Sequence, residues 1–139
     1  METQHPTCAI LADRHTGLCE GVRGLLETAF QTVYTVADTD SLRDGAKRLV
    51  PNLILLDLSL TEGDSPRMLR SIHDLSPNSR VILLTLHDQP AVARLALAAG
   101  AHGVVLKRSL GSDLLNAVDA VMRGETWVSP DFDMPARAH

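Results

Sequence analysis

The sequence has few aromatic residues and no cluster of basic residues, and these two shortages exclude a general nucleic-acid binder. It contains one Trp, one Tyr and two Phe, too few for a surface on which successive bases stack. Its 13 Lys and Arg residues are outnumbered by 17 Asp and Glu residues, giving a net charge of -4 at pH 7. A protein that neutralises phosphates needs the opposite balance. We therefore expect that this chain itself binds no nucleic acid.

Cysteines and long apolar runs are also scarce. Cys8 and Cys19 are too few for a disulfide framework and lack metal-ligand spacing. The opening residues, Met-Glu-Thr-Gln-His-Pro, do not have the basic and then apolar pattern of a signal peptide. No apolar stretch approaches the length that spans a membrane. We expect a cytoplasmic protein with reduced thiols and no membrane contact.

Strand and helix patterns alternate five times along the 139 residues, a length that suits one domain. Short apolar runs typical of buried parallel strands lie at 7–12, 31–36, 53–56, 81–84 and 103–106. Each is followed by apolar residues at helical spacing, with Ser65 and Asp88 as expected N-caps of the third and fourth helices. The alternation predicts an α/β fold, a flavodoxin-like (βα)5 three-layer sandwich with parallel strand order 2-1-3-4-5.

Four polar residues stand where strands of this predicted sheet end: Asp13, Asp57, Thr85 and Lys107. In the predicted order these ends meet at one rim. Carboxylates can hold Mg2+, a hydroxyl and an ammonium can bind phosphoryl oxygens, and Asp57 can attack phosphorus to form an acyl phosphate. Each residue alone has an ordinary explanation as a turn former, strand end or surface charge. Their combination favours a phosphoryl-transfer site.

Five motifs, in this order and spacing, resemble the receiver domain of bacterial two-component response regulators, in particular the NarL/FixJ type. They are Ile-Leu-Ala-Asp-Arg-His (10 to 15), Leu-Leu-Asp-Leu-Ser-Leu (55 to 60), Leu-Leu-Thr-Leu-His-Asp (83 to 88), Ala-Gly-Ala-His-Gly-Val-Val-Leu-Lys (99 to 107) and Arg-Gly-Glu (123 to 125). The resemblance runs from Cys8 to Gly124. It implies a receiver domain over residues 1–124 and a linker or C-terminal tail over 125–139.

The resemblance also implies roles for single residues. Asp57 would be the phosphoacceptor, Asp13 and Asp57 would hold Mg2+ together with the backbone carbonyl of Ser59, Thr85 would be the switch hydroxyl, and Lys107 would bind the phosphate. The phosphodonor would be a histidine kinase or a phosphotransfer protein. Any enzymatic activity would be limited to autocatalytic phosphoryl transfer to Asp57.

Arg14 departs from the family pattern, because it stands where a second acid is usual. The predicted rim then carries two negative charges, from Asp13 and Asp57, and two positive charges, from Arg14 and Lys107. Mg2+ should bind such a rim weakly or not at all. The guanidinium could pair with Asp57 and weaken it as a nucleophile, or point to solvent while Glu62 supplies a substitute oxygen. The sequence leaves both arrangements open.

Two further positions differ from the family. Val104 replaces the aromatic switch residue, and a small β-branched side chain cannot swing between buried and exposed states. In the loop after Asp57, Thr61 replaces the usual Pro and Ser65 the usual Gly. Together with Arg14, these changes keep a second hypothesis open: an atypical pseudo-receiver that acts as a phosphorylation-independent interaction or dimerisation module.

The predicted helix over 91–99 carries one charge, Arg94, and is otherwise Ala, Val and Leu. Such a helix is buried, covered by another chain, or simply rich in good helix formers. In the family this helix, the strand 103–106 and the last helix form the dimer or output surface, so the resemblance implies a homodimer through it.

Residues 125–130 resemble the start of a linker to a DNA-binding output domain. The chain is then either a single-domain receiver or part of a longer regulator. A flavin- or nucleotide-binding protein is disfavoured, because no Gly-rich loop follows the first strand. The spacing of His15, His87 and His102 indicates no metal set, so we expect them to be ordinary rim or surface residues.

Overall fold

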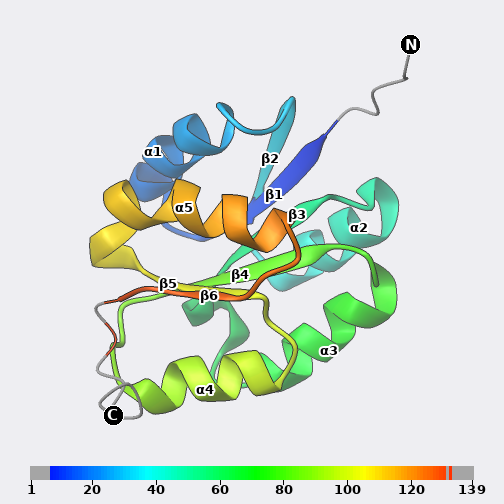
Figure 1. The fold of residues 1–139 in the computed structure, drawn as a ribbon. Helices are drawn as coiled ribbons and strands as arrows, with labels where there is room; N and C mark the ends of the chain where they lie inside the picture. Colours follow the sequence, from blue (N-terminus) through cyan, green and yellow to red (C-terminus); the bar gives the residue numbers. More distant parts are fainter. Residues whose placement is uncertain (1–6, 131, 133–139) are drawn as a thin grey trace.

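The computed structural model describes residues 7–130 and residue 132, apart from the side chains of residues 16–19. Strands and helices alternate along the chain (Figure 1). The strands are β1 (Cys8–Ala12), β2 (Thr32–Val36), β3 (Leu53–Asp57), β4 (Arg80–Thr85), β5 (Gly103–Leu106) and β6 (Trp127–Val128). The helices are α1 (Thr16–Leu26), α2 (Thr39–Leu49), α3 (Ser65–Leu75), α4 (Pro90–Ala98) and α5 (Leu110–Met122), with short 3-10 turns η1 (Leu58–Thr61) and η2 (Lys107–Ser109).

The sheet confirms the predicted strand order and extends it by one strand. Its order is β2-β1-β3-β4-β5-β6, and every neighbouring pair is parallel. The register places Asp57 beside Leu84 and Thr85 beside Leu106. The carboxyl ends of β3, β4 and β5 therefore lie at one edge of the sheet, as expected for a flavodoxin-like fold.

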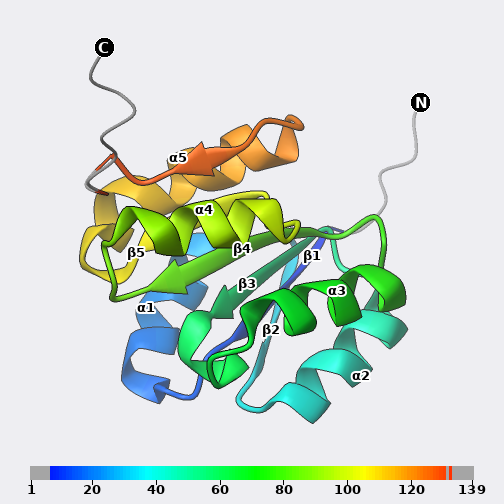
Figure 2. The same ribbon diagram turned by 90° about the horizontal axis from the view of Figure 1, so that it is seen from below.

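Helices cover both faces of the sheet, which explains why its central strands read as unbroken apolar runs. Helices α1 and α5 lie on one face, and α2, α3 and α4 lie on the other, the face in front in Figure 2. Two buried clusters fill the two interfaces. Alternate residues of one strand serve different clusters, so Leu53 and Leu55 pack under α1 and α5 while Ile54 and Leu56 pack under the other three helices.

The helix ends follow local capping chemistry, with two corrections to the caps expected from the sequence. Asp64, not Ser65, caps α3, accepting a hydrogen bond from the Arg67 amide, because Ser65 is already the first helical residue. Asp88 does not cap α4, which starts one residue later with Gln89 at the N-cap and Pro90 in the first turn. The Asp88 carboxylate instead pairs with Arg108 at 3.2 Å. Gly100 follows α4 at φ 112°, a positive φ that glycine adopts readily where a helix ends.

The residues after α5 pack against the domain. Trp127 and Val128 form β6 along the outer edge of β5. The buried hydroxyl of Ser129 accepts from the Leu106 amide at 3.0 Å and donates to an Asp113 carboxyl oxygen at 2.9 Å. Phe132 is buried in the cluster beneath α2, α3 and α4. The packed part of the chain thus continues past the predicted boundary at Gly124. Residues 131 and 133–139 of the predicted linker or tail lie outside the described residues.

Candidate functional site

The rim at the strand ends brings Asp13, Asp57 and Lys107 into contact. Asp57 ends β3, Asp13 directly follows β1, and Lys107 directly follows β5. The Lys107 ammonium lies 3.0 Å from Asp57 Oδ1 and 3.4 Å from Asp13 Oδ2, and all three side chains are almost fully buried. The ammonium therefore bridges two carboxylates that would otherwise repel each other across a region of low dielectric constant.

Asp57 also receives hydrogen bonds from the turn after β3. The Ser59 hydroxyl donates to Asp57 Oδ2 at 2.6 Å, and the Ser59 amide donates to Oδ1 at 3.4 Å. Burial alone would raise the pKa of Asp57, but the hydrogen bonds from Ser59 and Lys107, with the charge of Lys107, outweigh it and hold the pKa below its usual value. Asp57 is thus an ionised, positioned carboxylate.

Thr85 and Lys107 line the same cavity as Asp57. The cavity measures 380 Å³, and its wall includes the loop after β3, the end of β4 and the start of α4. The buried Thr85 hydroxyl accepts a hydrogen bond from the His87 amide at 3.0 Å. A group that enters this cavity meets a carboxylate, a hydroxyl and an ammonium. The three predicted catalytic residues, Asp57, Thr85 and Lys107, therefore lie at the same site.

Arg14 neither pairs with Asp57 nor points freely to solvent, the two arrangements that the sequence left open. Its side chain is exposed, and its guanidinium donates to the backbone carbonyl of Ser59 at 3.5 Å. Among the residues that the structure describes, no ion pair joins Arg14 to Asp57. The guanidinium thus donates to the carbonyl that the family resemblance assigns to the metal. The ion pair between Arg14 and Asp57, which would have weakened Asp57 as a nucleophile, is not formed.

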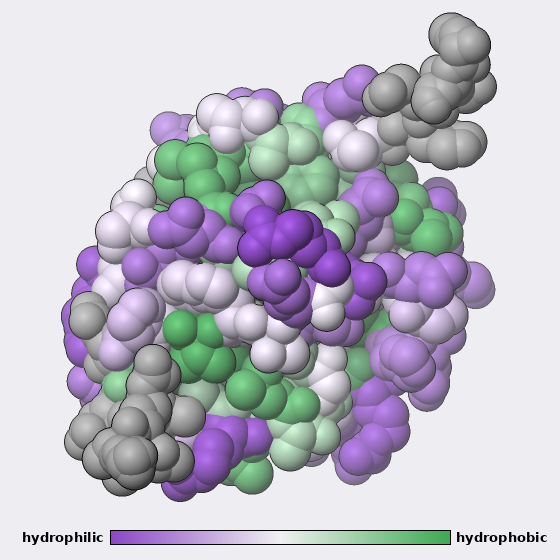
Figure 3. Space-filling view, in the orientation of Figure 1, coloured by the Kyte–Doolittle hydropathy of each residue, from purple (hydrophilic) through white to green (hydrophobic). Residues whose placement is uncertain are grey.

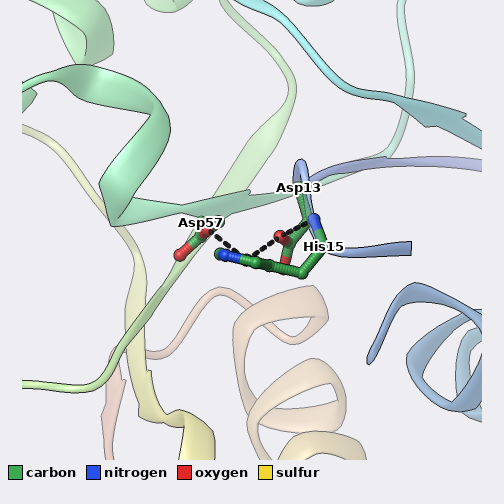
Figure 4. A group of neighbouring side chains, drawn as sticks. All are labelled: Asp13, His15 and Asp57. Carbon is green, nitrogen blue, oxygen red and sulfur yellow. Dashed lines mark hydrogen bonds and ion pairs between the residues drawn. The ribbon is translucent and has the colours of Figure 1, made fainter. Parts of the chain in front are cut away.

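His15 is the site residue that the sequence did not reveal. Its Nδ1 lies 3.0 Å from Asp13 Oδ1 and 3.6 Å from Asp57 Oδ2, so the imidazole ring lies between the two carboxylates (Figure 4). The His15 amide also donates to Asp13 Oδ1 at 2.9 Å, which fixes the turn after β1. Spacing from His87 and His102 carries no sign of this role. The signal in the sequence that could have indicated this role is the position of His15, two residues after Asp13.

Val104 and Thr61 are both buried, Val104 by packing in the core and Thr61 with a hydrogen bond to its own turn. Val104 lies in β5 and belongs to the cluster beneath α2, α3 and α4. The Thr61 hydroxyl donates to the Leu58 carbonyl at 2.7 Å, which closes the turn after Asp57 without a proline. Thr61 contributes to the wall of the cavity, whereas Val104 does not line it.

Apolar surface remains exposed around α4. Leu95 is 61% exposed and Leu86, in the loop before the helix, is 70% exposed. Leu97, by contrast, is partly buried against the core. Figure 3 shows apolar side chains gathered along α4 and between it and β6. The edge of β5 is paired with β6, so the exposed apolar part of the predicted dimer surface lies on α4 and, through Leu115 and Met122, on α5.

The donor atoms at the rim can be compared with the needs of a divalent cation. Asp13, His15 and Asp57 each offer one ligand atom, and these three atoms lie within 4.8 Å of one another. Asp13 and Asp57 thus fit a cation site in general. Mg2+ prefers an octahedral set of oxygens, and here one expected acid is Arg14 and the Ser59 carbonyl already accepts from a guanidinium.

Comparisons with known proteins agree with this geometry. The family model of the response regulator receiver domain matches residues 9–119. The oxygen regulatory protein NreC of Staphylococcus carnosus is 28% identical over 124 residues, which cover 87% of this chain and 57% of NreC. The chain therefore spans about half the length of the curated relatives it matches.

Solved structures show the same likeness. A LuxR family two-component response regulator from an Aurantimonas species superposes with a TM-score of 0.82 at 28% identity, covering 92% of this chain and 93% of that one. RcsB of Salmonella enterica serovar Typhimurium, solved bound to a promoter in the presence of a phosphomimetic, gives a TM-score of 0.74 at 27% identity, covering 91% of this chain and 64% of RcsB. In the described part of this chain, no helix is both long and apolar enough to cross a membrane.

Proposed function

We propose that Asp57 is the phosphoacceptor of this chain, because the chain belongs to the family of response regulator receiver domains. An Asp57 oxygen would form a bond to phosphorus while the bond from phosphorus to the donor's imidazole nitrogen breaks, and the leaving imidazole would take up a proton. The observation that carries the proposal is the Lys107 ammonium 3.0 Å from Asp57 Oδ1, at the wall of a cavity that Thr85 also lines.

Lys107 and Thr85 have separate parts in this proposal. Negative charge moves onto the phosphoryl oxygens during transfer, and a fixed ammonium stabilises that charge most strongly where water is excluded. The Thr85 hydroxyl can donate its proton to a phosphoryl oxygen while it accepts from the His87 amide. The lowered pKa of Asp57 keeps its carboxyl group ionised, as a nucleophile must be.

We also propose that Mg2+ binds this site weakly. Asp13 and Asp57 would be its carboxylate ligands, and the Ser59 carbonyl would complete the protein's share. A bound cation would supply positive charge next to the phosphoryl oxygens. Lys107 already contacts both carboxylates and offsets one of their two charges, and Arg14 donates to the Ser59 carbonyl. Mg2+ would have to displace Lys107 and Arg14 from these oxygens or bind beside their positive charges, and either lowers the affinity for Mg2+.

The phosphodonor and the output of the whole protein are proposed from the family. We propose a histidine kinase or a phosphotransfer protein as the donor, residues 1–124 as the receiver unit, and 125–139 as a linker or tail whose described part, up to Phe132, packs against that unit. NreC is named as a regulatory protein, and RcsB was solved on a promoter. We therefore propose that the whole protein regulates transcription through a DNA-binding partner or domain. We propose that the receiver controls this output by self-association through the exposed face of α4.

The phosphoacceptor proposal is tested with a small acyl phosphate in place of the kinase. The full chain is incubated with acetyl phosphate and Mg2+, and the intact mass is measured. We expect the mass of one added phosphoryl group, its loss in Asp57→Asn, and a slower gain in Thr85→Ala. Arg14→Asp should gain the group faster than wild type at low Mg2+. An unmodified wild type beside a modified Arg14→Asp would instead support the pseudo-receiver hypothesis.

A further inference from the structure

We propose that the site prefers a divalent transition metal to Mg2+, with His15 Nδ1 as a ligand beside Asp13 Oδ1 and Asp57 Oδ2. This inference rests on the proposed cation site between the two carboxylates, but it does not depend on phosphoryl transfer. The family resemblance assigns no ligand role to His15, so the assignment comes from the positions of these three side chains.

His15 Nδ1 already lies at metal-ligand spacing from one oxygen of each carboxylate. Metal ions such as Zn2+ hold nitrogen and oxygen ligands at about 2.0 to 2.2 Å, so two ligands of one ion lie roughly 3 to 4 Å apart. His15 Nδ1 is 3.0 Å from Asp13 Oδ1 and 3.6 Å from Asp57 Oδ2. Figure 4 shows the ring directed at both carboxylates. A metal ion can therefore replace the hydrogen bond at Nδ1 with small side-chain shifts.

The carboxylate oxygens are divided between the Lys107 ammonium and the His15 ring. Lys107 contacts Asp57 Oδ1 and Asp13 Oδ2. The other oxygen of each carboxylate faces His15. A metal ion at His15 would thus use oxygens that the ammonium leaves, although it must share Asp57 Oδ2 with the Ser59 hydroxyl and Asp13 Oδ1 with the His15 amide.

The chemistry of the donors decides which metal fits. Imidazole suits Zn2+, Co2+, Ni2+ and Cu2+, whereas Mg2+ takes oxygen ligands. At this rim the usual second acid is Arg14, the Ser59 carbonyl accepts from the guanidinium, and an imidazole stands between the remaining carboxylates. The first two features reduce the set of oxygen ligands, and the third adds a nitrogen ligand, so together they favour an ion that accepts nitrogen.

The site is also open to exchange. The His15 side chain is 56% exposed and lines the 380 Å³ cavity together with Asp57. Three protein ligands leave at least one coordination position toward this space, which is the arrangement of sites that bind a further molecule. A phosphoryl oxygen that enters the cavity would reach this position.

Titration of the full chain with Co2+ alone and with Mg2+ alone tests the inference, using calorimetry for affinity and the visible absorption of Co2+ for its ligands. We expect Co2+ to bind at least about tenfold more tightly than Mg2+. His15→Gln should weaken Co2+ binding by roughly 10- to 100-fold and change its absorption. His15→Asp should shift the preference back toward Mg2+, because it replaces the imidazole with oxygen.

His73→Gln is the matched control, because His73 is an exposed histidine on α3, outside this cavity. It should leave both affinities unchanged. Co2+ binding that is equal in wild type and His15→Gln, or Mg2+ binding at least as tight as Co2+, would overturn the inference and show that His15 only hydrogen-bonds Asp13. The mass assay on Asp57 runs separately with each metal, so a failed metal preference and a failed phosphoacceptor proposal give different results.

Discussion

Ser129→Ala should destabilise the domain well beyond what the loss of one exposed hydroxyl would cause. Ser129 lies just after β6 and is buried. Its hydroxyl accepts from the Leu106 amide and donates to Asp113 Oδ2. Alanine removes both bonds and leaves a buried amide of β5 and a buried carboxyl oxygen of α5 without these partners.

The size of the effect is set by those two groups. A buried polar group that loses its partner costs about 1–3 kcal/mol, so the two groups together set a range of about 2–6 kcal/mol. Asp113 keeps a second bond, from the Ser112 hydroxyl to Oδ1 at 3.1 Å. We therefore expect a loss of about 3 kcal/mol in the free energy of unfolding, in the lower half of that range.

Equilibrium unfolding in urea measures this quantity, with the single Trp127 as a fluorescent reporter in β6. Ser112→Ala is the matched control, because the Ser112 hydroxyl is exposed and bonds to the same carboxyl group. It should change the free energy of unfolding by less than about 1 kcal/mol, since the loss of an exposed bond is partly offset by the helix propensity of alanine.

The result that refutes the reasoning is equal stability of the two variants. A Ser129→Ala loss below about 0.5 kcal/mol would mean that water replaces the hydroxyl, or that β6 is not held against β5 in solution. A double variant with Asp113→Ala separates these outcomes. If the contact is formed, the two losses are not additive, because the second substitution removes a group that the first has already left unpaired.

Three further predictions concern the surface, a histidine and the rim. Leu95→Glu should abolish self-association in sedimentation experiments, whereas Leu49→Glu on α2 should not; equal effects would exclude the α4 face. Burial and the charges of Arg80 and His73 lower the pKa of His102, so stability should fall as pH drops below about 6.5, and His102→Asn should flatten that slope in urea midpoints; an unchanged slope would contradict it. Lys107→Gln should raise divalent cation affinity at least roughly tenfold by calorimetry, because it removes a competing charge; unchanged affinity would argue against competition.

The fold and the principal rim residues could be predicted because their signals are local and repeated. Strands β1, β3, β4 and β5 are short apolar runs, and a polar residue directly follows or ends each of them, as Asp57 and Thr85 do. The strand order then brings those residues to one edge of the sheet, whichever rotamers their side chains adopt. This is why Asp13, Asp57 and Lys107 meet in the structure at the predicted rim.

The remaining features depend on side-chain direction or on very short segments. His15 reaches both carboxylates because of its rotamer and the turn after β1, which spacing does not reveal. Arg14 was equally free to face Asp57 or solvent, and it reaches the Ser59 carbonyl instead. Strand β6 has two residues, too short for a periodic signal, and the Ser129 hydroxyl that follows it bonds the Leu106 amide of β5.

The most direct test of the central proposal locates the phosphoryl group on the chain. After incubation with acetyl phosphate, borohydride reduces an aspartyl phosphate to homoserine, and peptide mass analysis identifies the altered residue. We expect homoserine at position 57, lost in Asp57→Asn and reduced in Lys107→Gln. Reduction at another carboxylate, or no reduction under any metal, would contradict the assignment of Asp57 as the phosphoacceptor.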